Sequence, residues 1–362
     1  MQKIAIITLY GNNNYGNKLQ NYALQEKLEK MQCVAFTLKN YPYSNNKKNF
    51  FIKILKHKIH SIFNKKDSLF KNRELSFVKF NKYINYYSKV INAYNSKKFK
   101  EFDYFIVGSD QVWNPNFWSF SDVERLSFAS YNKRISYAAS FGIESLNDYN
   151  SNLLKKDIKH FKAISVREDA GKKIVDELTG RTDVEVLIDP TMLLTADDWD
   201  KVSKKPTMLK NDKYILNYFL GNLSVERKNE INRVAKENNC EVINILDKDS
   251  PFYECGPSEF LYLEKNAFLI CTDSFHSSVF GILYNTPFLV FKREDNNASM
   301  NSRLDTLLSK FKLEDRKYKG KITKKDLKCD YTEAYTILDK ERIKSMNFLK
   351  KALNIKDSDK NE

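Results

Sequence analysis

Short apolar runs alternate with helical patterns along almost the whole of this 362-residue chain, and this alternation constrains the fold more than any other feature. The runs of strand length cover residues 3–10, 102–110, 134–140, 163–168, 184–190, 213–220, 240–246, 267–273 and 287–292. Apolar residues at helical spacing lie between them, in 145–161, 169–179, 224–238, 258–266, 276–285 and 302–311. Strands that are apolar on both faces and alternate with helices are typical of parallel sheets covered on both sides. The pattern therefore predicts an α/β fold.

The length suggests about two such units, since a domain holds roughly 100–200 residues. A polar stretch at 195–212 that contains Pro206 is the expected boundary. We expect an N-terminal domain at 1–200 and a C-terminal domain at 201–345. Residues 346–362 then form the end of the last helix and a charged tail.

Composition excludes several classes of protein. Gly (10) and Pro (7) are too scarce for a collagen-like or linker-rich chain. No apolar run approaches the roughly 18–20 residues of a membrane-spanning helix, and the N-terminus reads as a first strand, not a signal peptide. Five scattered cysteines without a CxxC motif indicate a reducing, cytoplasmic location and no zinc site.

Most of the net charge of +15 lies in one segment. Residues 45–100 carry 15 Lys/Arg against two acidic residues, which is 15 − 2 = +13. Within this basic insertion, 50–63 places apolar residues at helical spacing with lysines between them. It forms either an amphipathic helix packed on the first domain or a helix that binds an anionic membrane surface. We expect no nucleic acid as partner, because the basic residues are not spread over a fold that reads it.

Two polar loops follow strands of the first predicted sheet, and ligands of parallel sheets bind at the carboxyl ends of the strands. Residues 11–24, GNNNYGNKLQNYAL, offer a helix N-terminus to an anion. The same residues are equally consistent with a strand–helix turn that binds no ligand. The stretch GSDQVWNP places Asp110, Gln111 and Trp113 in one exposed turn. A polar loop with an indole is suited to a sugar ring, but Trp113 is equally readable as a core residue.

Two further strand ends carry charged or titratable side chains. Arg167 ends a buried-type strand, where it either pairs with Glu168 or Asp169 or binds a carboxylate or phosphate. In TDSFHSSVF, His276 begins a helix directly after a strand, flanked by serine hydroxyls. Such a helix end is an anion site, and the histidine beside it is a candidate acid or base.

Together these segments resemble the polysaccharide pyruvyl transferase family. The residues that carry the resemblance are NNNYGNKLQNYALQ, FDYFIVGSDQVWNP, SVRED with IDPTMLL, and TDSFHSSVFGILYNTPFLVF with NSRLDTLL, in order over roughly 1–310. The resemblance implies a GT-B-like fold of two Rossmann-like domains with the active site in the interdomain cleft. It places the acceptor on the first domain and the donor on the second.

The resemblance also implies the reaction. Phosphoenolpyruvate is the donor, a saccharide hydroxyl is the acceptor, and the product is a pyruvate ketal on a capsule, exopolysaccharide or cell-wall glycan. The acceptor is either the polymer or a precursor linked to polyprenyl diphosphate, which would bring a cytoplasmic enzyme to the inner face of the membrane. No metal and no cofactor is needed, because a histidine of near-neutral pKa can protonate the methylene carbon.

The resemblance assigns roles by position. His276 is the general acid, and Arg167 followed by Glu168 matches the family's arginine and glutamate. Where many members have an arginine, this chain has Ser274, so the second cation for the donor has to come from elsewhere. The expected donor residues are Arg167, Ser274, Phe275, Ser277, Ser278, Lys292, Arg293 and Arg303. The expected acceptor residues are Asn14, Tyr15, Gln20, Asp110, Gln111 and Trp113.

Two other functions use the same fold. A nucleotide-sugar glycosyltransferase would hold a diphosphate at the same helix N-termini, with an acidic residue on the ribose. A non-catalytic glycan- or membrane-binding protein would keep the fold without the chemistry.

Overall fold

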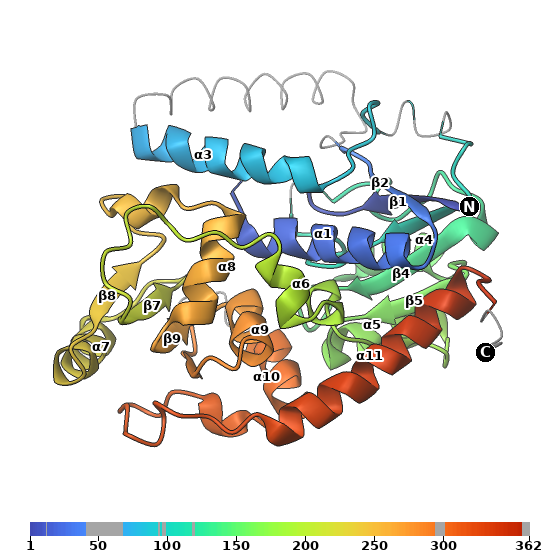
Figure 1. Cartoon of the computed structure of the whole chain (residues 1–362). Coiled ribbons are helices and arrows are strands. Elements are labelled where there is room, and N and C mark those ends of the chain that lie inside the picture. Colours follow the sequence, from blue (N-terminus) through green and yellow to red (C-terminus); the bar gives the residue numbers. More distant parts are fainter. Residues whose placement is uncertain are drawn as a thin grey trace, which may run out of the picture.

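The computed structural model describes residues 1–11, 13–40, 68–92, 95, 99–117, 120–293 and 301–356. Two parallel sheets, each flanked by helices, lie side by side in this structure (Figure 1). The predicted α/β class with two sets of parallel strands is thereby confirmed. The helix predicted over 50–63 and the last six residues of the tail lie outside the described residues.

The first sheet has six strands in the order β2-β1-β3-β4-β5-β6, and all neighbours pair in parallel. Its strands are β1 (Lys3–Ile7), β2 (Val34–Thr37), β3 (Tyr104–Val107), β4 (Arg134–Ala139), β5 (Ala163–Val166) and β6 (Glu185–Val186). Strand β2 was not predicted, and the other five coincide with predicted runs. Continuous apolar runs such as that of β1 form central strands here because helices cover both faces.

The second sheet has four parallel strands in the order β10-β9-β7-β8. They are β7 (Tyr214–Tyr218), β8 (Glu241–Asn244), β9 (Leu269–Thr272) and β10 (Phe288–Val290). All four lie within predicted runs.

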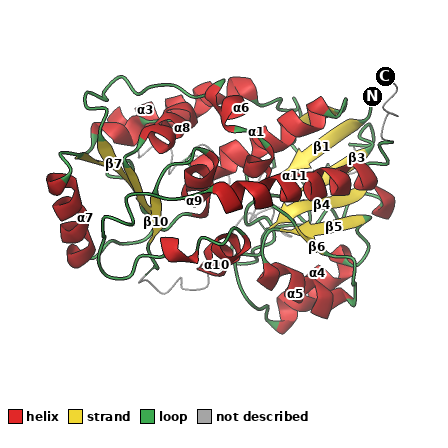
Figure 2. Ribbon diagram, turned by 60° about the horizontal axis from the view of Figure 1, so that its bottom comes forward, coloured by secondary structure: helices red, strands yellow, loops and turns green. Residues whose placement is uncertain are grey.

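Helices connect the strands and cover the sheets (Figure 2). The α-helices are α1 (Tyr15–Lys30), α3 (Ser68–Phe80), α4 (Asp148–Ile158), α5 (Asp169–Thr179), α6 (Ala196–Asp200), α7 (Val225–Glu237), α8 (Pro257–Asn266), α9 (Phe275–Leu283), α10 (Asn301–Lys310) and α11 (Thr332–Ala352). The 3-10 helices are η2 (Asn81–Tyr83), η4 (Tyr131–Lys133), η5 (Pro190–Leu193), η6 (Pro251–Glu254) and η8 (Glu314–Arg316).

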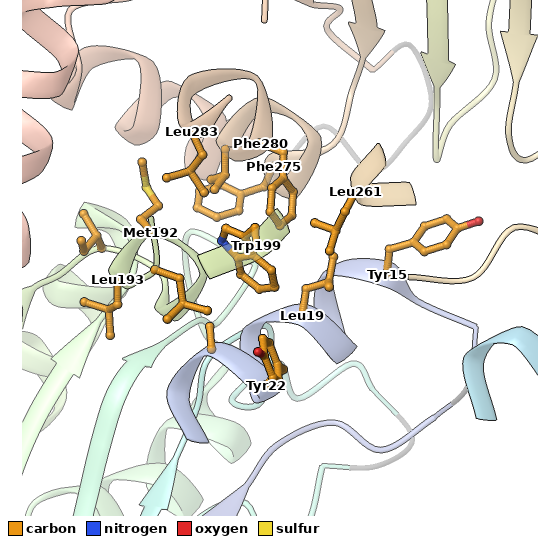
Figure 3. Close-up of a cluster of buried hydrophobic side chains, with 14 of the residues drawn as sticks. Tyr15, Leu19, Tyr22, Met192, Leu193, Trp199, Leu261, Phe275, Phe280 and Leu283 are labelled. Carbon is orange, nitrogen blue, oxygen red and sulfur yellow. The ribbon is translucent and has the colours of Figure 1, made fainter. Parts of the chain in front are cut away.

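One apolar cluster joins the two units. Tyr22 of α1 and Phe280 of α9 both pack on the indole of Trp199, with ring centroids 5.6 and 5.2 Å away (Figure 3). Because Trp199 is fully buried between helices of both units, the two sheets share part of their core. This shared core fixes the loops of one sheet against those of the other.

Two helices strengthen the junction. On α11, Arg342 donates hydrogen bonds to the carbonyls of Met192 and Leu194, so the last helix returns to the first unit. On α3, the buried Arg73 donates to the Tyr15 hydroxyl and to the Tyr253 carbonyl, which belong to different units. No helix among the described residues is long and apolar enough to cross a membrane.

Candidate active site

Loops from the carboxyl ends of both sheets meet at one place. Asp110 follows β3, Arg167 follows β5 and Asp189 lies beyond β6, while His276 lies in the first turn of α9, after β9. The contact between the units is direct, because His276 Nε2 lies 3.6 Å from Asp189 Oδ2. A narrow pocket at this junction is lined by residues of both units, including Arg167, Asp189 and Phe275.

Asp189 is the centre of this arrangement. Its Oδ2 accepts a hydrogen bond from Arg167 Nη1 at 2.8 Å and from the Ser109 hydroxyl at 2.7 Å. Its Oδ1 accepts from the backbone N–H and the hydroxyl of Thr191, at 3.0 and 2.7 Å. Burial alone would raise the pKa of Asp189, but His276, Arg167 and the Thr191 N–H outweigh it and hold that pKa well below its usual range. Asp189 is therefore a fixed negative charge between the arginine and the histidine.

Arg167 is held from three sides. Its side chain is 1% exposed, its Nη2 lies 3.7 Å from Asp110 Oδ1, and its Nε lies 3.9 Å from Glu168 Oε2. Burial would lower the pKa of this guanidinium, yet the carboxylates of Asp189, Asp110 and Glu168 raise it. Phe275 closes one face of the guanidinium, with its ring centroid 4.3 Å from Cζ.

Glu168 is oriented by the loop after β4. Its Oε1 accepts hydrogen bonds from the Ser140 hydroxyl and the Phe141 N–H, both at 2.9 Å. Its Oε2 has no hydrogen-bond partner among the described residues. One oxygen thus fixes the carboxylate, and the other is left for Arg167 or a ligand.

His276 packs against the start of α1. A Cβ placed on Gly16 would lie 2.0 Å from His276 Nδ1, so only glycine leaves room for this imidazole. The imidazole is 9% exposed, and its Nε2 has no hydrogen-bond partner in the described chain. At 3.6 Å, the contact of Nε2 to Asp189 is longer than a hydrogen bond.

Arg303 and Arg293 add positive charge to the site. Arg303 on α10 is 7% exposed, and its Nε has no partner among the described residues. Burial, followed by the charge of Arg167, lowers the pKa of Arg303 to about 10, so the guanidinium stays protonated at neutral pH. Arg293 after β10 pairs with Asp273, whose carboxylate also accepts from the N–H groups of Leu220 and Gly221.

The unpartnered N–H groups form a pattern. Within the described part of the chain, Arg167 Nε and Nη2, Arg303 Nε and His276 Nε2 are all buried without a hydrogen-bond partner. Buried donors in native proteins are nearly always satisfied, and exceptions mark bound ligands or functional strain. These four nitrogens, three of them on arginine side chains, fit an anion with several oxygens.

The expectation of an exposed turn after β3 is wrong. Asp110 and Gln111 are each 5% exposed and Trp113 is fully buried. The indole of Trp113 packs between Phe141 and Phe161 and donates its N–H to a backbone carbonyl, so it presents no platform to a sugar. This turn folds inward because its apolar residue completes the core of the first unit.

Tyr15 and Gln20 serve the framework as well. Tyr15 stacks on Phe260 at 4.4 Å, and its hydroxyl donates to the Cys255 carbonyl. Gln20 is buried, accepts from the Ser109 N–H and donates to the Thr8 hydroxyl. Neither side chain is free for an acceptor, which corrects the prediction for both.

The other predicted residues divide by exposure. Asn14 is exposed at the N-cap of α1 and accepts from the Asn17 N–H, and Lys292 is exposed beside the site. Ser274 is the buried N-cap residue of α9. The hydroxyls of Ser277 and Ser278 donate to Glu264 and to the Ser274 carbonyl, so they are already used and do not face an anion.

Three site residues escaped sequence reasoning: Ser109, Asp189 and Asp273. Asp189 precedes Pro190 and caps η5, so it reads as an ordinary helix cap. The signal that was available is its position, since it ends a predicted strand run of the same sheet as Arg167.

Comparison with known structures shows the fold. A protein from Listeria monocytogenes assigned as a UDP-N-acetylglucosamine 2-epimerase is 12% identical with a TM-score of 0.53, and the match covers 96% of this chain and 91% of that one. The UDP-GlcNAc 2-epimerase from Neisseria meningitidis is 13% identical with a TM-score of 0.50, over 97% and 100% of the two chains. These likenesses confirm a GT-B-type arrangement. No curated protein matches the chain by sequence.

Comparison with protein families gives a direct result. The family described as polysaccharide pyruvyl transferase matches residues 14–296, which is more than half of the chain. The match spans Arg167, Asp189 and His276, the residues that meet at the junction of the two sheets. The chain therefore belongs to the polysaccharide pyruvyl transferase family.

Proposed function

We propose that the protein transfers pyruvate from phosphoenolpyruvate to a sugar of a cell-surface polysaccharide or of its lipid-linked precursor, forming a ketal. The observation that carries the proposal is the group of buried, unpartnered N–H donors on Arg167, Arg303 and His276. Phosphoenolpyruvate carries a carboxylate and a phosphate on one small skeleton. Such a donor requires two cationic sub-sites close to a proton donor.

Arg303 supplies the cation that Ser274 cannot. It is buried and free of ion pairs among the described residues, whereas Arg293 is paired with Asp273 and Lys292 is exposed. We assign Arg303 to one anionic group of the donor and Nε and Nη2 of Arg167, which have no hydrogen-bond partner among the described residues, to the other. The planar fork of each guanidinium matches two oxygens of a carboxylate or phosphate.

His276 then acts as general acid. The imidazolium gives its Nε2 proton to the methylene carbon, and positive character develops at C2. A sugar hydroxyl bonds to C2 and loses its proton to the neutral imidazole. The C2–O bond to phosphate breaks with its electron pair on the phosphate, and a second hydroxyl of the same sugar bonds to C2 and gives its proton to the departing phosphate. One phosphoenolpyruvate and one diol thus give one ketal and one phosphate, and the reaction consumes no cofactor.

Asp189 prepares both groups for this chemistry. Its carboxylate faces Nε2 of His276 at 3.6 Å and fixes Nη1 of Arg167, so the other two guanidinium nitrogens, which have no hydrogen-bond partner among the described residues, are left for the donor. A positioned acid of this kind typically contributes about 10²–10⁴-fold to the rate. The free Oε2 of Glu168 lies beside Arg167, where it is placed to accept a hydrogen bond from the acceptor.

The acceptor enters from the side of the first unit. Asn14, exposed at the start of α1, borders this approach because its neighbour Gly16 touches His276. Assembly of the glycan on a lipid carrier would place the enzyme at the inner face of the cell membrane, with the basic segment 45–100 as its contact to anionic lipid. That location is part of the proposal.

A glycosyltransferase that uses a nucleotide sugar is the rival within this fold. It would need a free acidic residue for the ribose in the second unit. Asp273 is already occupied by Arg293 and two backbone N–H groups, and Glu264 is fully buried and bonded by Ser277. The described acidic residues nearest the site therefore favour the pyruvyl donor.

Transfer of a labelled pyruvyl group tests the proposal. Phosphoenolpyruvate labelled with ¹³C at C2 is incubated with the protein and a panel of lipid-linked and free glycans. We expect the label to become a ketal carbon in a glycan, with equimolar phosphate. His276→Ala should abolish the transfer, and His160→Ala is the matched control, since His160 stacks on Tyr131 at the surface. Release of phosphate without incorporation of label, or equal transfer by both variants, would contradict the mechanism.

A further inference from the structure

A buried lysine without an acidic partner lies on α1. Lys18 is 1% exposed, and its ammonium donates hydrogen bonds to Asn81 Oδ1 and to the Tyr86 hydroxyl, both at 2.7 Å. Both partners are neutral oxygens, and Lys18 forms no ion pair within the described ranges. An ammonium has three N–H groups, so one of them is left for a further acceptor.

A second lysine faces the same aromatic ring. The ammonium of Lys39, just beyond β2, lies 4.9 Å from the ring centroid of Tyr86, and that of Lys18 lies 5.2 Å from it. Lys39 also lacks an ion pair among the described residues. Burial, and next the charge of Lys39, lowers the pKa of Lys18 to about 7. Two like charges around one ring are unfavourable unless an anion joins them.

The position of this pair relates it to the reaction centre. Lys18 lies in the N-terminal part of α1, where the helix dipole also favours an anion. Gly16, two residues earlier, touches His276. Residues two apart on a helix point about 200° away from each other. An anion at Lys18 would thus lie on the far side of α1 from the imidazole, outside the reaction centre.

The pair is partly exposed to solvent. Lys39 and Tyr86 are half-buried, while Lys18 is enclosed. Two ammonium groups beside one ring suit a compact oxyanion, since lysine binds phosphate and carboxylate as a point charge.

We propose that Lys18, Lys39 and Tyr86 form a subsite for an oxyanion carried by the acceptor glycan, on the far side of α1 from His276. The inference rests on the proposed function for the identity of the acceptor. The oxyanion has two possible sources of the same chemistry, the diphosphate of a lipid-linked precursor and the carboxylate of an acidic sugar.

Binding of inorganic pyrophosphate tests the subsite without an acceptor. The protein is first saturated with phosphoenolpyruvate, which fills the donor site, and is then titrated with pyrophosphate by calorimetry. We expect Lys39→Met and Lys18→Met to weaken pyrophosphate binding at least tenfold. Lys30→Met is the matched control, because Lys30 lies on the same helix, is exposed and pairs with Asp198. Equal binding by wild type and both variants, or no binding at all, overturns the proposal.

Kinetics then separate a binding role from a structural one. A subsite predicts that Lys39→Met raises the KM of a charged acceptor at least tenfold and leaves the KM of phosphoenolpyruvate unchanged. A structural role alone would lower the Tm without changing the KM of the acceptor. If Lys18→Met does not fold, the result for Lys39→Met alone decides between the two roles. Acceptors with a diphosphate, with a uronate or with neither identify the source of the charge. If phosphoenolpyruvate itself does not bind, the proposed function fails, and pyrophosphate titration of the free protein still decides the subsite.

Discussion

Replacing Gly16 by alanine should lower activity because the added methyl group displaces His276. Gly16 lies in the first turn of α1, where the helix propensity of alanine, roughly 0.5–1 kcal/mol at most, offsets only part of the cost of overpacking, about 1–3 kcal/mol. The added methyl would lie 2.0 Å from His276 Nδ1 and 2.3 Å from Cγ. Since ordinary contacts of a Cβ begin at 3.4 Å, the imidazole has to move by about 3.4 − 2.0 = 1.4 Å.

This displacement sets the expected size of the effect. A misplacement of about 1 Å in an active site can cost about 10²-fold in rate. At 1.36 kcal/mol per tenfold, that corresponds to about 2.7 kcal/mol of transition-state stabilisation. The movement also changes the position of Nε2 relative to Asp189, which it faces at 3.6 Å. We therefore expect kcat to fall roughly 100-fold, with a smaller change in the KM of the donor.

Steady-state phosphate release with the active glycan measures kcat, and thermal unfolding measures stability. Gly11→Ala is the matched control in the same loop, because its Cβ would meet nothing closer than the Asn13 amide oxygen at 3.5 Å. It should retain near wild-type kcat. If Gly16→Ala keeps more than half of the wild-type kcat with an unchanged or higher Tm, the position assigned to His276 is wrong.

Three further variants test other parts of the site and the core. Arg303→Met should weaken phosphoenolpyruvate binding about 10–100-fold in calorimetry, because a charged hydrogen bond contributes about 1.5–3 kcal/mol. Lys292→Met, at an exposed position, is its control. Equal affinities of Arg303→Met and wild type for phosphoenolpyruvate would exclude Arg303 from the donor site. In urea unfolding at pH 7, Asp189→Asn should have a lower free energy of unfolding than wild type. This difference in free energy should disappear as the pH falls below about 4, because the folded-state pKa of Asp189 is depressed and the stabilisation by its carboxylate is lost on protonation. A difference that is constant with pH would refute this. Burial raises the pKa of Glu124 to about 7. The free energy of unfolding of wild type should therefore fall by on the order of 3 kcal/mol between pH 4 and pH 8, whereas that of Glu124→Gln should not. Parallel dependence of the two unfolding free energies on pH would contradict that account.

The strand and helix pattern of the chain could largely be predicted from sequence. Buried parallel strands are continuous apolar runs, and helices follow them at 3.6-residue spacing, so both signals are local. The exception is β2, whose four residues alternate between exposed and buried at the edge of the sheet. Three of its four residues, VAFT, are apolar, but the strand begins only four residues after the end of α1 and therefore reads as a continuation of that helix.

The candidate site was only partly predictable. Arg167 and His276 could be found because each stands out at the end of a strand run. The inward fold of Trp113 could not, because local sequence does not tell which face of a turn meets the core. The role of Asp189 depends on a contact between two sheets, and no pattern within one segment reports it.

The choice of Arg303 over Arg293 and Lys292 likewise needed the structure. All three are cations that follow His276 in the sequence, and their spacing does not separate them. Burial and pairing do, since Arg303 is buried and forms no ion pair within the described residues, whereas Arg293 is paired with Asp273 and Lys292 is exposed.

Titration of the protein with its expected donor tests the central claim most directly, because it needs no acceptor. Calorimetry is run with phosphoenolpyruvate and, separately, with a nucleotide sugar such as UDP-GlcNAc, on wild type and on Arg303→Met. The account predicts that phosphoenolpyruvate binds wild type, that Arg303→Met weakens this binding at least tenfold, and that the nucleotide sugar does not compete. Tight binding of the nucleotide sugar with no measurable binding of phosphoenolpyruvate would contradict it.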